Sequence, residues 1–327
     1  MKVKISAISY HLPDKVEGVD VLQRDNPDWD MPRILEKTGV HNRYISSPDE
    51  TAVDLAFKAG EKLFENASIR NDVDLLILVT QSPDYVLPSS ACILQDRFCL
   101  LKNCMAFDVN LGCSGFVYSI SIAGGLIESG VVSKCLILCA DTYSKYIKKN
   151  DRTCRPVFSD GAAAILLEKS NTDCIGPFEF GTDGSGYDRL IVKDSGARGI
   201  SQKSNSHLSF IEMRGSDVFL FTMRVVPVSI NNLLKKAGIG IKDIDVFVFH
   251  QASKFVIDNL IQNMSLDRGK VFINYDSIGN TVSASIPIAL KDAVLKRRLK
   301  EGDTIMIVGF GVGLSWGAAL MRWSTIS

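Results

Sequence analysis

The chain has neither an excess of charge of one sign nor a long unbroken apolar run. Its 37 Lys and Arg residues balance its 37 Asp and Glu residues, which argues against a nucleic acid or an anionic membrane surface as partner. The longest apolar run, at residues 305–320, is glycine-rich and falls short of the about 20 residues of a membrane span. Residues 1–5 lack the apolar core of a signal peptide. We therefore expect a cytoplasmic protein with no nucleic-acid or membrane partner.

Paired cysteines are also missing. The eight cysteines form no CxxC pair and have no regular spacing, and several of them, such as Cys135 and Cys139, lie in strand-like apolar stretches. This pattern favours reduced, buried thiols over a disulfide framework or a zinc site. The glycine-rich segments 181–186 and 309–313 are explained by turns or lack a following helix, so they do not predict a phosphate or dinucleotide loop. We expect no metal and no cofactor.

Cys113 is the most informative residue that is present. It follows an apolar, strand-like run and stands directly before a helical pattern, in the segment Asn-Leu-Gly-Cys-Ser-Gly-Phe at residues 110–116. A lone Cys is usually a small buried hydrophobe. At a helix N-terminus, however, the dipole and the free N–H groups favour the thiolate, which is the attacking species in acyl transfer. We therefore expect Cys113 to be an ionised, reactive nucleophile.

The chain is internally duplicated. Acidic turns at residues 71–74 and 242–245 each lead into a continuous apolar run, as expected for strands buried on both faces. The second run ends at His250. Gly112-Cys113 and Gly279-Asn280 each open an apolar helical pattern, the second extending to residue 299 and bent near its start by Pro287.

Cys113 and Asn280 thus occupy equivalent places in two βαβ-rich halves, which we assign to residues 1–170 and 171–327. In α/β sheets, chemistry gathers at strand ends, so Cys113 and Asn280 should face each other with His250 nearby. A Cys, a His and an Asn form a nucleophile set and not a metal set. A polar segment at residues 198–207 is expected to be a surface loop.

These motifs resemble those of the β-ketoacyl-ACP synthase III family of thiolase-fold condensing enzymes over nearly the whole length. The resemblance rests on the segments around Cys113, His250 and Asn280, on Phe-Ser-Asp-Gly-Ala at 158–162, and on the glycine-rich segment 309–317. It implies an α/β thiolase-like fold with five α-β-α-β-α layers. The absence of a second Cys in segment 309–317 separates the chain from the thiolases, and Asn280 separates it from the elongating synthases, which have His there.

The resemblance also implies a mechanism and a homodimer. Cys113 takes an acyl group as a thioester, and His250 and Asn280 hold the carbonyl of a malonyl-ACP extender as carbon dioxide leaves. Backbone N–H groups of Cys113 and Val312 would hold the oxyanion. The acyl carrier protein is the implied partner, and CoA or phosphopantetheine thioesters are the implied substrates. The implied substrate-binding residues are Lys37, Leu87, Arg152, Ser253, Lys254, Phe310, Gly311 and Val312.

The entrance departs from the family pattern. Arg33 and Lys37 replace the Trp and Arg of the CoA clamp, and Leu220 and Phe255 replace a Lys and an Arg that serve carrier docking. These changes indicate a specialised paralogue with a different donor, carrier or acceptor, unless they are drift of exposed positions. Two further functions stay open: a Cys-His acyltransferase that acts on an alcohol or amine without decarboxylation, and a non-catalytic partner subunit of another synthase.

Overall fold

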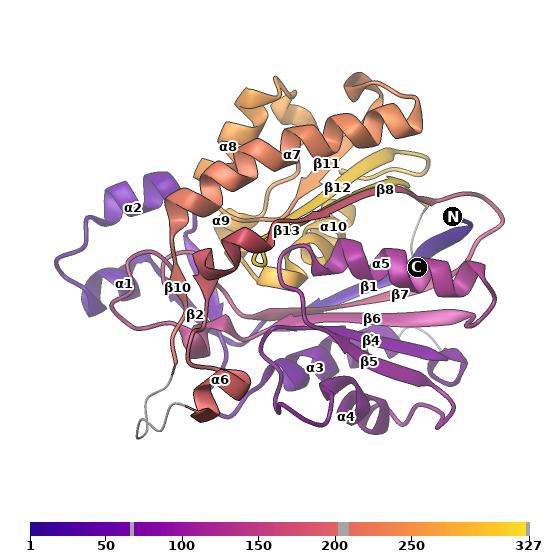
Figure 1. Cartoon of the computed structure of the whole chain (residues 1–327), viewed down its shortest axis with the longest axis horizontal. Coiled ribbons are helices and arrows are strands. Elements are labelled where there is room, and N and C mark those ends of the chain that lie inside the picture. Colours follow the sequence, from indigo (N-terminus) through magenta and orange to yellow (C-terminus); the bar gives the residue numbers. More distant parts are fainter. Residues whose placement is uncertain (66–68, 202–208, 325–327) are drawn as a thin grey trace.

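Two β-sheets organise the molecule. The computed structural model describes residues 1–65, 69–201 and 209–324 (Figure 1). The first sheet has the strand order β1-β7-β6-β4-β5, with β4 parallel to both of its neighbours. Its strands are β1 (Val3–His11), β4 (Leu75–Val79), β5 (Met105–Val109), β6 (Lys134–Asp141) and β7 (Gly161–Lys169).

The second sheet repeats this topology. Its order is β11-β12-β13-β8, and an isolated bridge between Phe247 and Val271 stands where a fifth strand would lie beside β11. Its strands are β8 (Ile175–Thr182), β11 (Val246–Phe249), β12 (Thr304–Gly311) and β13 (Ser315–Arg322). When the strands of each sheet are numbered in chain order, and the bridge at Val271 is counted as the third strand of the second sheet, both sheets have the order 1-5-4-2-3. The predicted duplication is therefore present in the strand order.

Five layers result from this duplication. Helices α5 (Gly115–Glu128) and α10 (Ser285–Leu295) lie between the sheets, and α5 contacts strands of both (Figure 1). Helices α3 (Ala52–Phe64) and α4 (Ser90–Arg97) cover the outer face of the first sheet, and α7 (Gly215–Ala237) and α8 (Lys254–Asn263) cover that of the second. This confirms the α-β-α-β-α, thiolase-like arrangement.

Shorter elements connect and flank the layers. The strands are β2 (Lys15–Gly18), β3 (Asn42–Ile45), β9 (Leu190–Ile191) and β10 (Glu212–Met213), and the helices are α1 (Val19–Asp25), α2 (Met31–Thr38), α6 (Gly196–Ser201) and α9 (Tyr275–Ile278). Single 3₁₀ turns span Arg70–Asp72, Tyr143–Tyr146, Gly184–Arg189, Ile241–Asp243, Arg268–Lys270 and Val282–Ala284.

Local sequence explains the main elements. Every residue of β4 and β11 is buried, because helices cover both faces of each sheet. A capping box between Thr51 and Asp54 starts α3. In the described part of the chain, α7 alone has the length and apolar composition of a possible membrane span, yet it contains Pro227 and buries its apolar face in the core of the second half.

Three expectations about helices need correction. The pattern after Asn280 forms a 3₁₀ turn before α10, which ends at Leu295 and not at residue 299. Pro287 falls in the first turn of α10, where a backbone N–H has no helical partner to lose, so it does not bend the helix. The expected loop at 198–207 is helical as far as Ser201, in α6, and its remainder lies outside the described residues. The division into domains at residues 170 and 171 stays a prediction.

Candidate active site

Cys113 lies in the turn between β5 and α5, just before the helix begins. Its side chain is buried, with 6% exposed. The end of β12, from the second half, approaches it so closely that a Cβ atom added to Gly311 would lie 2.8 Å from the Cys113 Sγ. Gly311 is therefore required for close approach, and the thiol stands where the two halves meet.

The resting thiol is protonated. Burial, together with the charge of Asp141, raises the pKa of Cys113 to about 12, although the N–H groups of Val312 and of Cys113 itself act to lower it. The expectation of a resting thiolate was wrong, because the sequence places Cys113 before a helix but does not show how completely it is desolvated. Attack by Cys113 therefore needs a base.

His250 is the predicted residue that could act as this base. It follows β11 and is held there by a bond from its own N–H to the Val308 carbonyl, 2.8 Å. Its ring packs edge-on against Phe310, with 5.7 Å between centroids. Burial lowers the pKa of His250 to about 3, so the imidazole is neutral at physiological pH and can accept a proton.

Asn280 lies beside the imidazole, with 3.3 Å between Asn280 Nδ2 and His250 Nε2. Its amide is oriented by the Val282 N–H, which donates to Asn280 Oδ1 over 2.9 Å. The backbone of Asn280 also pairs with the first half: its N–H donates to the Val157 carbonyl, and the Ser159 N–H donates to the Asn280 carbonyl. The amide hydrogens of Asn280 therefore point toward the His250 side of the site.

Ser285, in the first turn of α10, was not predicted as a site residue. Its buried Oγ lies 2.6 Å from His250 Nδ1. With Asn280 donating to Nε2, the Nδ1–H donates to Ser285, so Nε2 is the unprotonated nitrogen of the ring. A hydroxyl both donates and accepts, so Ser285 also fits the other imidazole tautomer.

Asp141 ties the two halves together behind these side chains. It ends β6, is fully buried, and accepts from the Gln81 N–H over 2.8 Å and from the Ser283 hydroxyl over 2.5 Å. Burial raises the pKa of Asp141 to about 6, while these donors act to lower it. His250 was identified because it is a polar residue at the end of an apolar strand. The same signal would have identified Asp141.

An apolar chamber surrounds Cys113. We define this chamber as the cluster of buried residues that pack together around the thiol. These residues are Cys113, Tyr143, Cys154, Phe158, Leu190, Ile211 and Val282.

The predicted residues of the glycine-rich segment all lie at this chamber. Phe310 packs on His250, Gly311 faces the Cys113 thiol, and Val312 packs against the chamber and directs its N–H toward Cys113. A β-branched residue at position 312 is accommodated here without a left-handed backbone, since Val312 does not have a positive φ. The N–H groups of Cys113 and Val312 thus converge on the place of the expected oxyanion.

The predicted entrance residues lie further out. Arg152 is exposed and pairs with Asp28 at 3.4 Å, in the segment that leads into α2, which carries the exposed Lys37. Ser253 caps α8 by accepting from the Val256 N–H. Lys254 pairs with Asp258 at 2.6 Å. We call this outer region the rim. Arg152 and Lys37 lie on one part of it, near α2, and Ser253 and Lys254 lie on another, at the start of α8.

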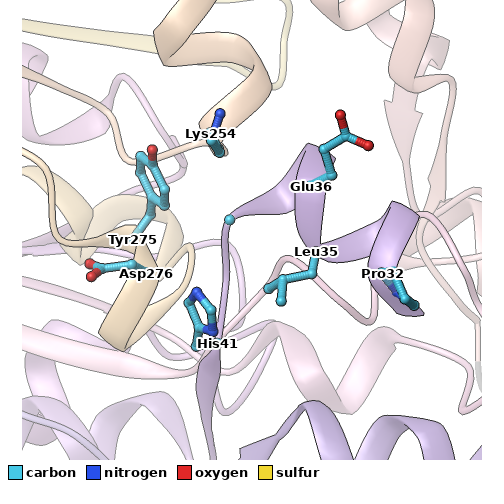
Figure 2. Close-up of a pocket in the computed structure, with 8 residues that line it drawn as sticks. Pro32, Leu35, Glu36, His41, Lys254, Tyr275 and Asp276 are labelled. Carbon is cyan, nitrogen blue, oxygen red and sulfur yellow. The ribbon is translucent and has the colours of Figure 1, made fainter. Parts of the chain in front are cut away.

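A groove of about 540 Å³ lies between α2, the start of α8 and α9, and Figure 2 shows the side chains that line it. Lys254 and Tyr275 stand on one side of it, and Leu35 and Glu36 of α2 on the other. The groove brings Lys254 next to the helix that carries Lys37. Neither Lys37 nor Arg152 lines the groove.

Leu87 does not contact the chamber within its own chain. It is 79% exposed, as are its neighbours Val86 at 83% and Tyr85 at 60%. Three adjacent apolar side chains that project into solvent are unusual for a folded chain, and such a patch marks an interaction surface.

The cysteines differ from expectation in part. All eight are free thiols, but Cys92 and Cys99 are exposed and Cys104 is partly exposed. Within the described residues, no group of three or more His, Cys, Asp or Glu side chains is placed to hold a metal ion.

Comparison with known proteins gives consistent matches. Residues 107–184 match the family 3-oxoacyl-[acyl-carrier-protein] synthase III, and residues 234–323 match its C-terminal part. The chain is 40% identical to a β-ketoacyl-[acyl-carrier-protein] synthase III of Clostridioides difficile (strain 630), over 99% of both chains.

Solved structures agree with this. A crystal structure of a 3-oxoacyl-(acyl-carrier-protein) synthase III superposes with a TM-score of 0.94 at 41% identity, over 99% of this chain and 100% of the other. A 3-oxoacyl-(acyl-carrier-protein) synthase from Burkholderia xenovorans LB400 gives a TM-score of 0.93 at 31% identity, over 100% and 95% of the two chains. The chain belongs to the β-ketoacyl-[acyl-carrier-protein] synthase III family.

Proposed function

We propose that this protein condenses an acyl group, carried as a thioester on Cys113, with malonyl-ACP to give a 3-oxoacyl product and carbon dioxide. One observation carries the proposal. His250 and Asn280 contact each other, the neighbouring residues Phe310 and Gly311 reach His250 and the buried Cys113 thiol respectively, and two backbone N–H groups act on that thiol. This set provides a nucleophile, a base and separate binding for two developing negative charges.

The first half-reaction acylates the enzyme. His250 Nε2 accepts the Cys113 proton as Sγ attacks the carbonyl of the acyl donor. The oxyanion that forms accepts from the N–H groups of Cys113 and Val312. Collapse of this intermediate breaks the bond to the donor's sulfur, and the imidazolium returns its proton to that leaving thiolate. A neutral His250 suits this step, because its Nε2 carries no proton and can accept one.

The second half-reaction uses the other imidazole tautomer. With the proton on Nε2, both His250 and Asn280 donate to the thioester oxygen of malonyl-ACP, while Ser285 donates to Nδ1. Loss of carbon dioxide then leaves an enolate whose charge these donors stabilise. The enolate carbon attacks the acyl-Cys113 carbonyl. The carbon–Sγ bond breaks, and Cys113 regains a proton from solvent.

The other two functions are less well supported. A transfer to an alcohol or amine needs a nucleophile and a base, but it gives no role to the amide of Asn280, which is oriented beside Nε2. A non-catalytic subunit needs none of the three side chains. The steps above require no metal and no organic cofactor, because the substrates carry their own thioesters.

The rim of the site bears on which carrier delivers the substrate. The exposed start of α8 and the adjacent face of α7 present apolar side chains at the rim: Leu220 is 64% exposed and Phe255 is 46% exposed, and Phe255 contacts the ring of Phe219 at 4.8 Å. An apolar rim suits a carrier protein with an apolar docking face better than one that relies on acidic residues alone. We propose a dedicated carrier protein, with poorer use of CoA thioesters.

A homodimer would complete the acyl pocket. The exposed Tyr85, Val86 and Leu87 follow β4, and β5, which carries the exposed Met105, forms an open edge of the first sheet. Open edges and exposed apolar segments favour pairing with a second copy. In this arrangement Leu87 of each chain would reach the chamber of the other. We propose a cytoplasmic homodimer.

The proposal is tested on the intact protein with malonyl-ACP and a panel of acyl-CoA and acyl-ACP donors. Intact-protein mass should show a single acyl addition, lost in Cys113→Ala, and carbon dioxide should be released in proportion to product. Acylation without carbon dioxide release would favour simple acyl transfer. No acylation by any donor would favour a non-catalytic subunit. Efficient turnover of acyl-CoA with the housekeeping carrier would show that the rim changes are drift.

A further inference from the structure

Tyr143 introduces a polar group into the otherwise apolar chamber. It lies directly after β6, at the start of a 3₁₀ turn, and only 6% of it is exposed. Its ring packs on Phe158 with 5.3 Å between centroids. Its hydroxyl donates to Gln81 Oε1 over 2.7 Å. Burial raises the pKa of Tyr143 well above its ordinary value, so the phenol is a neutral donor.

Gln81 lies equally close to the nucleophile. A Cβ atom added to Gly112, the neighbour of Cys113, would lie 2.5 Å from Gln81 Oε1. The Gln81 backbone is fixed by its bond to Asp141. The hydrogen bond from Tyr143 therefore holds the Gln81 amide beside the turn that presents the thiol.

The Gln81 amide still has two hydrogens to donate. With Oε1 bound to Tyr143, its Nε2 group faces away from the phenol, and no residue of the described ranges 1–65, 69–201 and 209–324 accepts from it. Gln81 is half-buried. An acyl group that packs against its amide would take water away from these hydrogens. A buried donor left without an acceptor is costly, and a plain alkyl chain supplies none.

We propose that Tyr143 and Gln81 make the acyl pocket select acyl groups that carry a hydroxyl or oxo group over plain alkyl chains of the same size. The acceptor oxygen of such a group takes the free Gln81 hydrogens, and Tyr143 orients the amide. This inference rests on the proposed function, because it concerns the acyl group that Cys113 receives. A site that hydrogen-bonds a substrate group discriminates strongly against the analogue that lacks it.

The test compares 3-hydroxybutanoyl and pentanoyl thioesters, which have the same number of heavy atoms in the acyl chain, on one carrier. The rate of Cys113 acylation is followed by intact-protein mass in single turnovers. Wild type should prefer the hydroxyacyl donor by about tenfold or more. The hydroxyacyl group gains a hydrogen bond, whereas the alkyl group leaves the Gln81 N–H without an acceptor. Gln81→Leu and Tyr143→Phe should each reduce this preference to about twofold or less, mainly by slowing the hydroxyacyl donor.

A matched control is Tyr118→Phe. Tyr118 is half-buried and, like Tyr143, makes one hydrogen bond through its hydroxyl, to the Gly181 carbonyl at 3.2 Å, but it lies on α5 outside the chamber. It should keep the wild-type preference. The inference is overturned if wild type accepts pentanoyl as fast as 3-hydroxybutanoyl, or if Gln81→Leu leaves the preference unchanged. In those cases acylation and carbon dioxide release still support the proposed function. Acylation by no thioester at all would overturn both.

Discussion

Replacing Ser285 with Ala tests whether the imidazole works in two tautomers. The change removes a hydroxyl with almost no change in shape and leaves the buried Nδ1 of His250 without its 2.6 Å partner. An unpaired buried donor or acceptor costs about 1–3 kcal/mol. This corresponds to roughly a 5- to 150-fold loss in the rate of each step that depends on the orientation of His250. Because Ser285 accepts in one half-reaction and donates in the other, both half-reactions should slow.

Two assays separate the half-reactions. Single-turnover acylation of Cys113 is followed by mass, and decarboxylation of malonyl-ACP by the acylated enzyme is followed by carbon dioxide release. Ser119→Ala is the matched control, because Ser119 is equally buried but its Oγ has no hydrogen-bond partner. It should leave both rates unchanged. If Ser285→Ala keeps both rates within twofold of the Ser119→Ala control, Ser285 does not position His250 and the two-tautomer mechanism is wrong.

Four further outcomes are expected. Asn280→Ala should slow carbon dioxide release by about a hundredfold or more while acylation persists; equal losses would contradict its role. Gly311→Ala should abolish acylation, since its methyl group would lie 2.8 Å from the thiol, and normal acyl-enzyme yields would refute this. Leu87→Phe should shift donor preference toward acetyl from the medium or branched chains that we expect, as a donor panel would reveal. Because the pKa of His250 is about 3, the acylation rate should show no limb near pH 6.5, and a pH–rate profile with that limb would contradict a neutral imidazole.

The same His250 affects stability with a definite sign. Its pKa in the folded protein, about 3, lies below the ordinary histidine pKa of 6.5. The unfolded chain therefore binds the extra proton between these values, and this residue lowers the free energy of unfolding as pH falls from about 6.5 toward 3. Asp141 acts in the opposite direction. Its pKa is raised to about 6, so the folded protein binds the extra proton, and this residue raises the free energy of unfolding as pH falls below about 6.

Much of the architecture could be predicted from the chain because buried parallel strands have a strong signature. The runs at β4 and β11 are continuous and apolar, and the acidic turns before them repeat. The equivalence of Cys113 and Asn280 followed from their places before two apolar helices, and the strand order bears it out. These features depend on local patterns, which a sequence records directly.

What could not be predicted depends on contacts between distant segments. The protonated state of Cys113 arises from burial under β12, and the contact of Ser285 with His250 depends on how α10 begins after a 3₁₀ turn. The bond between Tyr143 and Gln81 joins the ends of two different strands. No periodicity marks these residues. Conversely, Cys92 and Cys99 appeared to be buried on composition alone, and they are exposed.

The repeated strand order has a consequence for how such a site can arise. A single half carries one position before a buried helix, so two identical halves would present the same residue twice across the pseudo-twofold axis. Once both halves are fused in one chain, the two positions can diverge. In the proposed mechanism, one holds Cys113, which forms and breaks covalent bonds, and the other holds Asn280, which only donates hydrogen bonds. The proposed reaction is asymmetric, because one thioester is attached to the protein and the other is only bound. Two different residues at equivalent positions allow a nearly symmetric fold to carry it out.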